Sequence, residues 1–133
     1  MTREVRRIAV ELLAVRSTRE GGVERLTPIG ELDIATAPTL ERAFTGVFGD
    51  DNVRMIVVDL TELAFMDSSG LHVVLRMAEA CKDADRLRVI NGSRSVERLL
   101  DVSGVRDRLP IIASHRDPLA PLPSRPSRRE GLA

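Results

Sequence analysis

The sequence predicts a single α/β domain built on a mixed, mostly parallel β-sheet. A length of 133 residues suits one domain with its own core. From Val53 onward, short apolar stretches alternate with stretches of helical periodicity, which is typical of parallel strands joined by crossover helices. Two apolar stretches near the N-terminus are separated only by a turn-forming segment, which predicts an antiparallel pair and makes the sheet mixed.

The antiparallel pair is expected at residues 8–15 and 23–32, with the turn in the intervening "STREGG". Pro28 falls inside the second strand. Because proline has no N–H to donate to a ladder, we expect Pro28 at a strand edge or a bulge.

The first helix is expected within "DIATAPTLERAFTGVF". Its apolar residues recur at helical spacing: Leu40, Ala43, Phe44, Val47 and Phe48. Thr36 is placed to be the N-cap, and Pro38 falls in the first turn, where a missing N–H costs little.

The rest of the domain is expected to alternate strand and helix. The expected strands are residues 53–60, 86–90 and 109–113, and the expected helices are residues 69–82 and a segment that Ser93 or Ser95 opens and Gly104 ends. The strand at 53–60 is apolar on both faces, as in a central parallel strand.

The chain changes in composition after residue 113. Residues 114–133 contain four of the seven prolines, several arginines and no apolar periodicity. The predicted organisation is therefore one domain over residues 1–113 and a disordered tail over residues 114–133.

Charge and cysteine content exclude several classes of function. Twenty basic and twenty acidic residues cancel, so the net charge favours neither nucleic acid nor an anionic membrane as the partner. The single cysteine, Cys81, rules out an internal disulfide and fits a reducing compartment. With no long apolar run and no leader pattern, the sequence predicts a cytoplasmic protein.

The sequence offers little for catalysis. Ser68, His72 and Asp67 could be imagined as a triad, but residues so close in sequence at one strand–helix junction rarely converge in the required geometry. "MDSSG" also lacks the first glycine of the hydrolase serine elbow. Cys81 has no partner at metal-ligand spacing. We therefore expect neither an enzyme nor a metal or cofactor site.

Three features could carry a binding function. Asp33 in "GELD" could serve only a turn or a helix N-terminus, and "DSSG", Asp67 to Gly70, could be only a helix cap with a glycine for close approach. The helix after "DSSG" has an apolar arc of about 220°, wider than one-sided packing requires. Either a neighbour inside the domain or another protein covers the extra flank.

The segments "GELDIATAP", "MIVVDL" and "FMDSSGL", in this order, resemble the STAS domain of bacterial anti-sigma factor antagonists, and the resemblance extends over nearly all of residues 8–113. It implies a small mixed sheet with helices packed on one side and no catalytic activity. It also implies that a partner, both anti-sigma factor and serine kinase, phosphorylates Ser68. The unphosphorylated form would bind that partner and so free the sigma factor. The phosphorylated form would not bind, and a phosphatase would restore the unphosphorylated, binding form.

The resemblance further implies a docking surface around Ser68. Its residues would be Asp33, Thr36, Asp67, Ser68, Ser69, Gly70 and His72. His72 stands where members of the family often carry a small residue. We expect Ser68 in the loop before the helix and Asp33 near Asp67, so that a phosphate would build an acidic patch. The alternative is a STAS scaffold subunit of a larger signalling or transporter complex that uses the same surface without phosphorylation.

Overall fold

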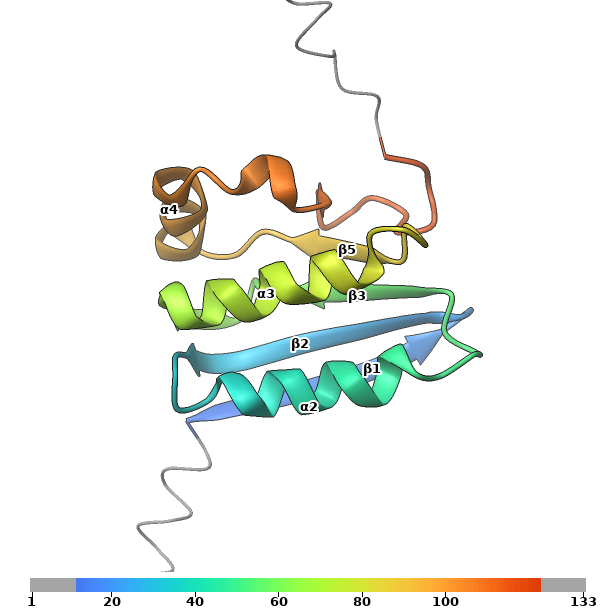
Figure 1. Ribbon diagram of the computed structural model, residues 1–133, viewed down its shortest axis with the longest axis horizontal. Helices are drawn as coiled ribbons and strands as arrows, with labels where there is room; N and C mark the ends of the chain where they lie inside the picture. Colours follow the sequence, from blue (N-terminus) through green and yellow to red (C-terminus); the bar gives the residue numbers. More distant parts are fainter. Residues whose placement is uncertain (1–11, 123–133) are drawn as a thin grey trace, which may run out of the picture.

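The computed structural model describes residues 12–122. Its elements are β1 (Leu13–Glu20), β2 (Val23–Leu32), α2 (Ala37–Phe48), β3 (Met55–Asp59), β4 (Leu63–Met66), α3 (Ser68–Cys81), β5 (Leu87–Ile90), α4 (Arg94–Ser103), a short 3-10 helix (Arg106–Arg108) and β6 (Ile111–Ile112). The sheet has the order β1-β2-β3-β5-β6, and β4 pairs with β2 beyond the end of β3 (Figure 1). Only β1 and β2 are antiparallel, which confirms the mixed, mostly parallel sheet.

The N-terminal hairpin differs from its predicted position in one strand. β2 has the predicted bounds, but β1 continues to Glu20, through residues that were expected to form the turn. The turn is only Gly21 and Gly22, both at positive φ (57° and 78°), as a two-residue hairpin turn favours. The polar residues of β1 fit a strand because β1 lies at the edge of the sheet. The predicted start of this strand, before residue 12, lies outside the described residues.

Pro28 is in an interior strand and not at an edge of the sheet. β2 pairs with β3 over Val23–Leu26 and with β4 over Gly30–Leu32, so Pro28 falls between these two parallel partners. The register with β4 also shifts between Gly30 and Glu31. Pro28, which has no N–H to donate, therefore lies where β2 is paired with neither β3 nor β4, so no hydrogen bond between parallel strands is lost.

The helices have the predicted positions within a residue or two. Thr36 is the N-cap residue of α2, although its side chain makes no cap hydrogen bond, and Pro38 lies in the first turn. Ser93 precedes α4, and Gly104 ends it in the left-handed conformation at φ 66°. The sequence reading missed β4, a four-residue strand, and placed a longer strand where β6 has two residues.

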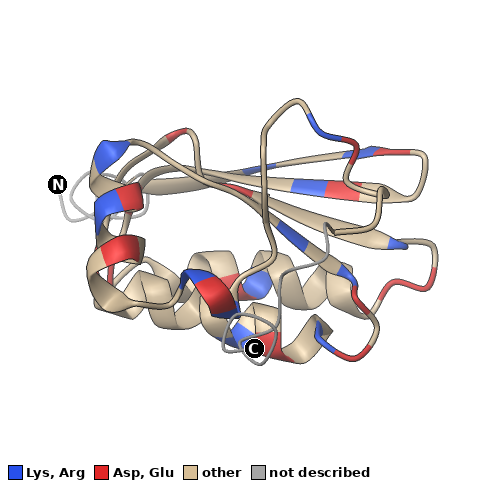
Figure 2. Cartoon of the chain, turned by 90° about the horizontal axis from the view of Figure 1, so that it is seen from above, with Lys and Arg blue, Asp and Glu red and all other residues tan. Residues whose placement is uncertain are grey.

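The helices pack on one face of the sheet, as expected. Figure 2 shows the sheet on one side and the two long helices, α2 and α3, on the other, with α4 at one end. The main core fills the space between the sheet and these helices. A smaller cluster, made of Met55, Val57, Ile90 and Ile112, lies on the other face of the sheet. Leu122 packs against this second cluster.

The structure describes the first part of the predicted tail. Residues 114–122 form turns in which the Arg116 N–H bonds the Ala113 carbonyl (3.0 Å) and the Ala120 N–H bonds the Asp117 carbonyl (3.1 Å). Leu122 is half-buried. Residues 123–133, the rest of the predicted tail, lie outside the described residues.

Candidate functional site

The candidate site lies where two paired parallel strands end. Leu32 of β2 is in register with Met66 of β4, and the Asp67 N–H bonds the Leu32 carbonyl at 3.1 Å. Asp33 and Asp67 each follow these paired residues directly. Parallel strands bring their carboxyl ends to the same edge of a sheet, so the two motifs that carry Asp33 and Asp67 meet there.

Asp67 caps helix α3. Its Oδ1 accepts hydrogen bonds from the N–H groups of Ser69 (2.9 Å) and Gly70 (3.1 Å). The helix therefore begins at Ser68, not after it, and the expectation of Ser68 in the preceding loop is wrong. The side chain of Asp67 favours this start because it takes two backbone donors that would otherwise have no acceptor.

Ser68 is exposed, and Ser69 is half-buried. In the interior of a helix, a residue at the position of Ser68 would point toward the apolar arc of α3. At the first helical position there is no preceding turn for the side chain to lie over, so the Ser68 hydroxyl remains accessible. His72, one turn further along the same helix, is also exposed.

Gly70 holds α3 against the end of β2. A Cβ at this position would lie 2.7 Å from Cγ of Leu32, 2.8 Å from the Leu32 carbonyl oxygen and 2.9 Å from Cγ of Met66. Gly70 itself is buried. Its role in the site is thus to set the position of the helix that carries Ser68.

Asp33 organises the loop between β2 and α2. Its Oδ1 accepts from the N–H groups of Ala35 (3.0 Å) and Thr36 (3.1 Å). The Thr36 hydroxyl donates to the Glu31 carbonyl (2.7 Å) and accepts from the Asp33 N–H (2.9 Å). Thr36 is 5% exposed, so it stabilises the loop from beneath while Asp33 remains half-exposed.

Sequence reasoning missed Ile34, which is 78% exposed beside Asp33. The sequence does contain a signal for it. Ile34 stands before the N-cap and outside the apolar stripe of α2, so the helix has no means of burying it. A large exposed apolar side chain next to a candidate docking residue favours a contact with another protein.

A groove of about 500 Å³ runs beside Ser68, between α3 and the chain that follows α4. We call it the Ser68 groove. The residues that line it include Ser68, Leu71, His72, Leu75 and Arg76 on one side and Val105 and Arg108 on the other. Most of the wide apolar arc of α3 is buried in the domain, where α2 packs beside it, whereas Leu75 is only half-buried and faces the groove.

The geometry does not build a hydrolytic triad. The Asp67 carboxylate bonds backbone N–H groups of the first turn, and within residues 12–122 no hydrogen bond joins Asp67 to His72 or His72 to Ser68. Cys81 is buried, and burial raises the pKa of its thiol, which disfavours the reactive thiolate. Residues 12–122 also contain no group of three or more His, Cys, Asp or Glu side chains placed to hold a metal ion.

Within the same described range, no helix has both the length and the apolar character needed to span a bilayer.

Comparison with known proteins identifies close similarities. The family model of the STAS domain matches residues 14–117. The anti-sigma-B factor antagonist of Staphylococcus aureus is 32% identical over 83 residues, which cover 62% of this chain and 76% of that protein.

Solved structures share the fold. An anti-sigma factor antagonist from Mycobacterium paratuberculosis superposes with a TM-score of 0.70 at 24% identity, covering 77% of this chain and 87% of that one. The anti-sigma factor antagonist SpoIIAA in its unphosphorylated form gives 0.61 at 25% identity over 76% and 90% of the two chains. The phosphorylated form of SpoIIAA, from Bacillus, gives 0.58 at 20% identity over 76% and 93%.

Proposed function

This chain belongs to the STAS domain family, and from that membership we propose that it is an anti-sigma factor antagonist controlled by phosphorylation of Ser68. Unphosphorylated, it binds an anti-sigma factor that is also a serine kinase, and so releases a sigma factor. Phosphorylated, it no longer binds, and a phosphoserine phosphatase restores it. The name of the Staphylococcus aureus relative, an anti-sigma-B factor antagonist, supports the regulatory, non-enzymatic part of this proposal.

The observation that carries the proposal is the exposed hydroxyl of Ser68 at the first position of α3, directly after the capping Asp67. A kinase needs an accessible hydroxyl on a well-placed backbone, and both conditions hold here. In the proposed reaction, Ser68 Oγ attacks the γ-phosphorus of ATP, ADP leaves, and the hydroxyl proton passes to a base of the kinase.

Charge explains how the modification would control binding. A phosphoserine carries nearly two negative charges at neutral pH. It would stand beside Asp67 and near the half-exposed Asp33, so the surface that docks the partner would become strongly acidic. Like-charge repulsion and the cost of desolvating the phosphate then oppose binding, while the fold itself is maintained. That SpoIIAA keeps this fold in its phosphorylated form supports the second point.

The test compares the affinity of four proteins for the anti-sigma factor, first identified by pull-down with the unphosphorylated chain. Wild type and Ser68→Ala should bind alike. Ser68→Asp should bind about 1 to 3 kcal/mol more weakly, because a carboxylate is left without a partner in the contact. The kinase-treated protein should carry one phosphate, on Ser68, and bind at least as weakly as Ser68→Asp. Titration calorimetry measures the affinities, and mass mapping locates the phosphate.

Ser95→Asp is the matched control, since Ser95 is another exposed serine in the first turn of a helix, α4. It should bind like wild type. Equal affinity of all the proteins would overturn the switch and leave the scaffold alternative. Phosphate found on Ser69 would overturn the assignment of Ser68.

A further inference from the structure

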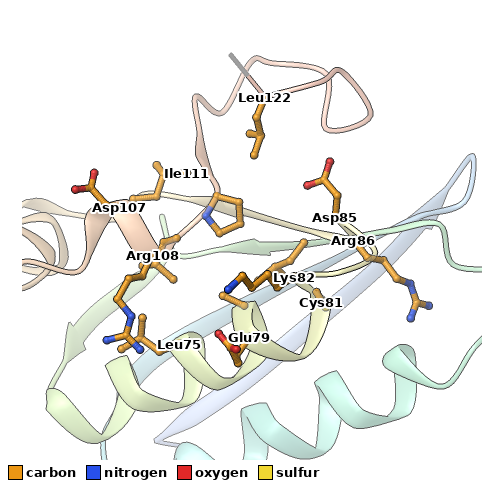
Figure 3. A pocket seen from close by; sticks show the side chains of 14 residues that line it. Leu75, Glu79, Cys81, Lys82, Asp85, Arg86, Asp107, Arg108, Ile111 and Leu122 are labelled. Carbon is orange, nitrogen blue, oxygen red and sulfur yellow. The ribbon is translucent and has the colours of Figure 1, made fainter. Parts of the chain in front are cut away.

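The Ser68 groove adjoins a second, larger hollow along α3. The second hollow has a volume of about 730 Å³ and lies between the C-terminal part of α3 and the segment that leads to β6 (Figure 3). Leu75, Glu79 and Arg108 line both hollows, so the two lie next to each other. Figure 3 shows the Arg108 side chain reaching from the 3-10 helix down toward α3, beside Leu75.

The N-terminus of α3 alone would not stabilise a phosphate on Ser68. Phosphates at helix N-termini are usually bound by the free N–H groups of the first turn. Here Asp67 already accepts from the N–H groups of Ser69 and Gly70. The phosphate would also lie beside the carboxylate of Asp67, which repels it. Other donors are needed to stabilise it.

The Ser68 groove supplies such donors. His72 lies four residues after Ser68 on the same helix, a spacing that puts the two Cβ atoms about 5–6 Å apart. An imidazole can donate a hydrogen bond from a ring N–H in either protonation state. Arg108 lies across the groove and forms no ion pair with any residue between 12 and 122. Its planar fork of donors matches the oxygens of a phosphate.

The other charged groups of the Ser68 groove are less suited to this role. Arg76 already pairs with Glu41 of α2, at 2.6 Å. Glu79 is the only acidic residue that lines the Ser68 groove within the described chain, and it also faces the second hollow, on the turn of α3 beyond Arg76. Along α3, His72 and Arg76 therefore stand nearer to Ser68 than Glu79 does, and Arg108 is the one arginine lining the Ser68 groove that forms no ion pair within residues 12–122.

We propose that the Ser68 groove is a phosphate-binding site for the phosphorylated form of this same chain, in which His72 and Arg108 hold the phosphate monoester on Ser68. The proposal rests on the phosphorylation of Ser68 proposed above and adds an intramolecular contact to it. The modified side chain turns into the groove and ties α3 to the 3-10 helix. Phosphorylation then covers the half-buried Leu75 as well as adding charge, so two changes oppose docking of a partner.

The test uses the full chain with phosphoserine incorporated at position 68 during translation, so that it needs neither the kinase nor the anti-sigma factor. Phosphorus NMR follows the titration of the phosphate, whose second pKa is ordinarily about 6. A nearby cation favours the dianion and so lowers this pKa. We therefore expect the midpoint of the phosphate titration to be higher in Arg108→Gln than in the phosphoserine protein without a further substitution (the Arg108 protein), by about 0.5 pH units or more. His72→Gln should raise it too, and Arg108→Lys should retain part of the effect.

Arg98→Gln is the matched control, because Arg98 is exposed on α4 and does not line the Ser68 groove. Its midpoint should equal that of the Arg108 protein. An unchanged midpoint in both Arg108→Gln and His72→Gln, or an equal rise in Arg98→Gln, would overturn the phosphate site. Circular dichroism confirms that each variant is folded, and if Arg108→Gln is not, the surface variant His72→Gln decides alone. Failure of a kinase to modify Ser68 would instead count against the proposed function and leave this measurement intact.

Discussion

At the scale of single residues, Gly70 is the position where the site is least able to accept change. It is buried, and any Cβ there would lie within 3 Å of Leu32 and of Met66. The contact atoms include the Leu32 carbonyl, which belongs to the backbone of β2 and cannot turn aside. The strand and the helix must separate to make room, and that movement displaces Ser68.

Gly70→Ala should therefore lower the free energy of unfolding by about 1 to 3 kcal/mol, because it overpacks a close contact. Gly46→Ala is the control: Gly46 lies exposed in α2, and a Cβ there meets nothing within 4 Å. It should be neutral or stabilising by up to about 1 kcal/mol, since alanine is the better helix residue. Urea unfolding measures both changes. An equally stable Gly70→Ala would contradict the packing role.

Local sequence chemistry predicted part of the site. The motif from Asp67 to Gly70 was interpreted as a cap followed by a close-approach glycine, and both roles are present in the structure. The position of Thr36 as the N-cap residue of α2 was predicted, but the loop hydrogen bonds of its hydroxyl and the exposure of Ile34 were not. The hydroxyl of Thr36 bonds the carbonyl of Glu31 in the loop behind it, and this depends on how the loop folds back and not on a local motif.

At the scale of elements, the strands show which parts of the fold sequence patterns do not predict. β2, β3 and β5 lie inside the sheet and each contains buried apolar residues, and all three were predicted within two residues at each end. β1 lies at an edge and is mostly polar, and β4 has only four residues. Such strands exist because a neighbour supplies hydrogen bonds, so their own sequences contain only a weak signal. The helices were predictable because each has its own apolar periodicity and end signals.

Arg86 joins two elements that are distant in sequence. Arg86 directly precedes β5, and its guanidinium donates to the carbonyls of Phe48 (2.6 Å), Asp50 (2.9 Å) and Val53 (2.8 Å) and lies 5.4 Å from the centre of the Phe48 ring. Phe48 is the last residue of α2, and Asp50 and Val53 follow it, so none of these carbonyls has a partner within the helix. Arg86 thus fixes the connection between α2 and β3.

Arg86→Lys should lower the free energy of unfolding by about 1.5 to 3 kcal/mol, because one ammonium cannot bond three carbonyls that a planar fork reaches together. The exposed Arg98→Lys should change it by less than about 0.5 kcal/mol. Urea unfolding of the two variants and wild type gives both values. Equal stability of Arg86→Lys and wild type would show that the connection needs no arginine.

At the scale of the whole molecule, the two faces of the sheet are covered in different ways. α2 and α3 bury one face with a large core. On the other face, the second cluster has no helix above it in the described chain, and Leu122 packs against it. Composition indicated disorder for everything after residue 113, because Pro and Arg dominate that segment. Composition has no information about a single leucine that meets an apolar patch.

This contact leads to a prediction about the segment that follows β6. Leu122→Ala should lower the melting temperature by about 3 to 5 °C, the equivalent of about 1 kcal/mol for a half-buried leucine in a domain of this size. Leu119 is 38% exposed and lies outside both apolar clusters, so Leu119→Ala should leave the melting temperature unchanged. Deletion of residues 114–133 should lower the melting temperature by at least as much as Leu122→Ala does. If both single variants and the deletion have the same melting temperature as wild type, the segment after β6 does not stabilise the second face of the sheet. The cluster of Met55, Val57, Ile90 and Ile112 would then be stable without Leu122, by packing within the sheet alone.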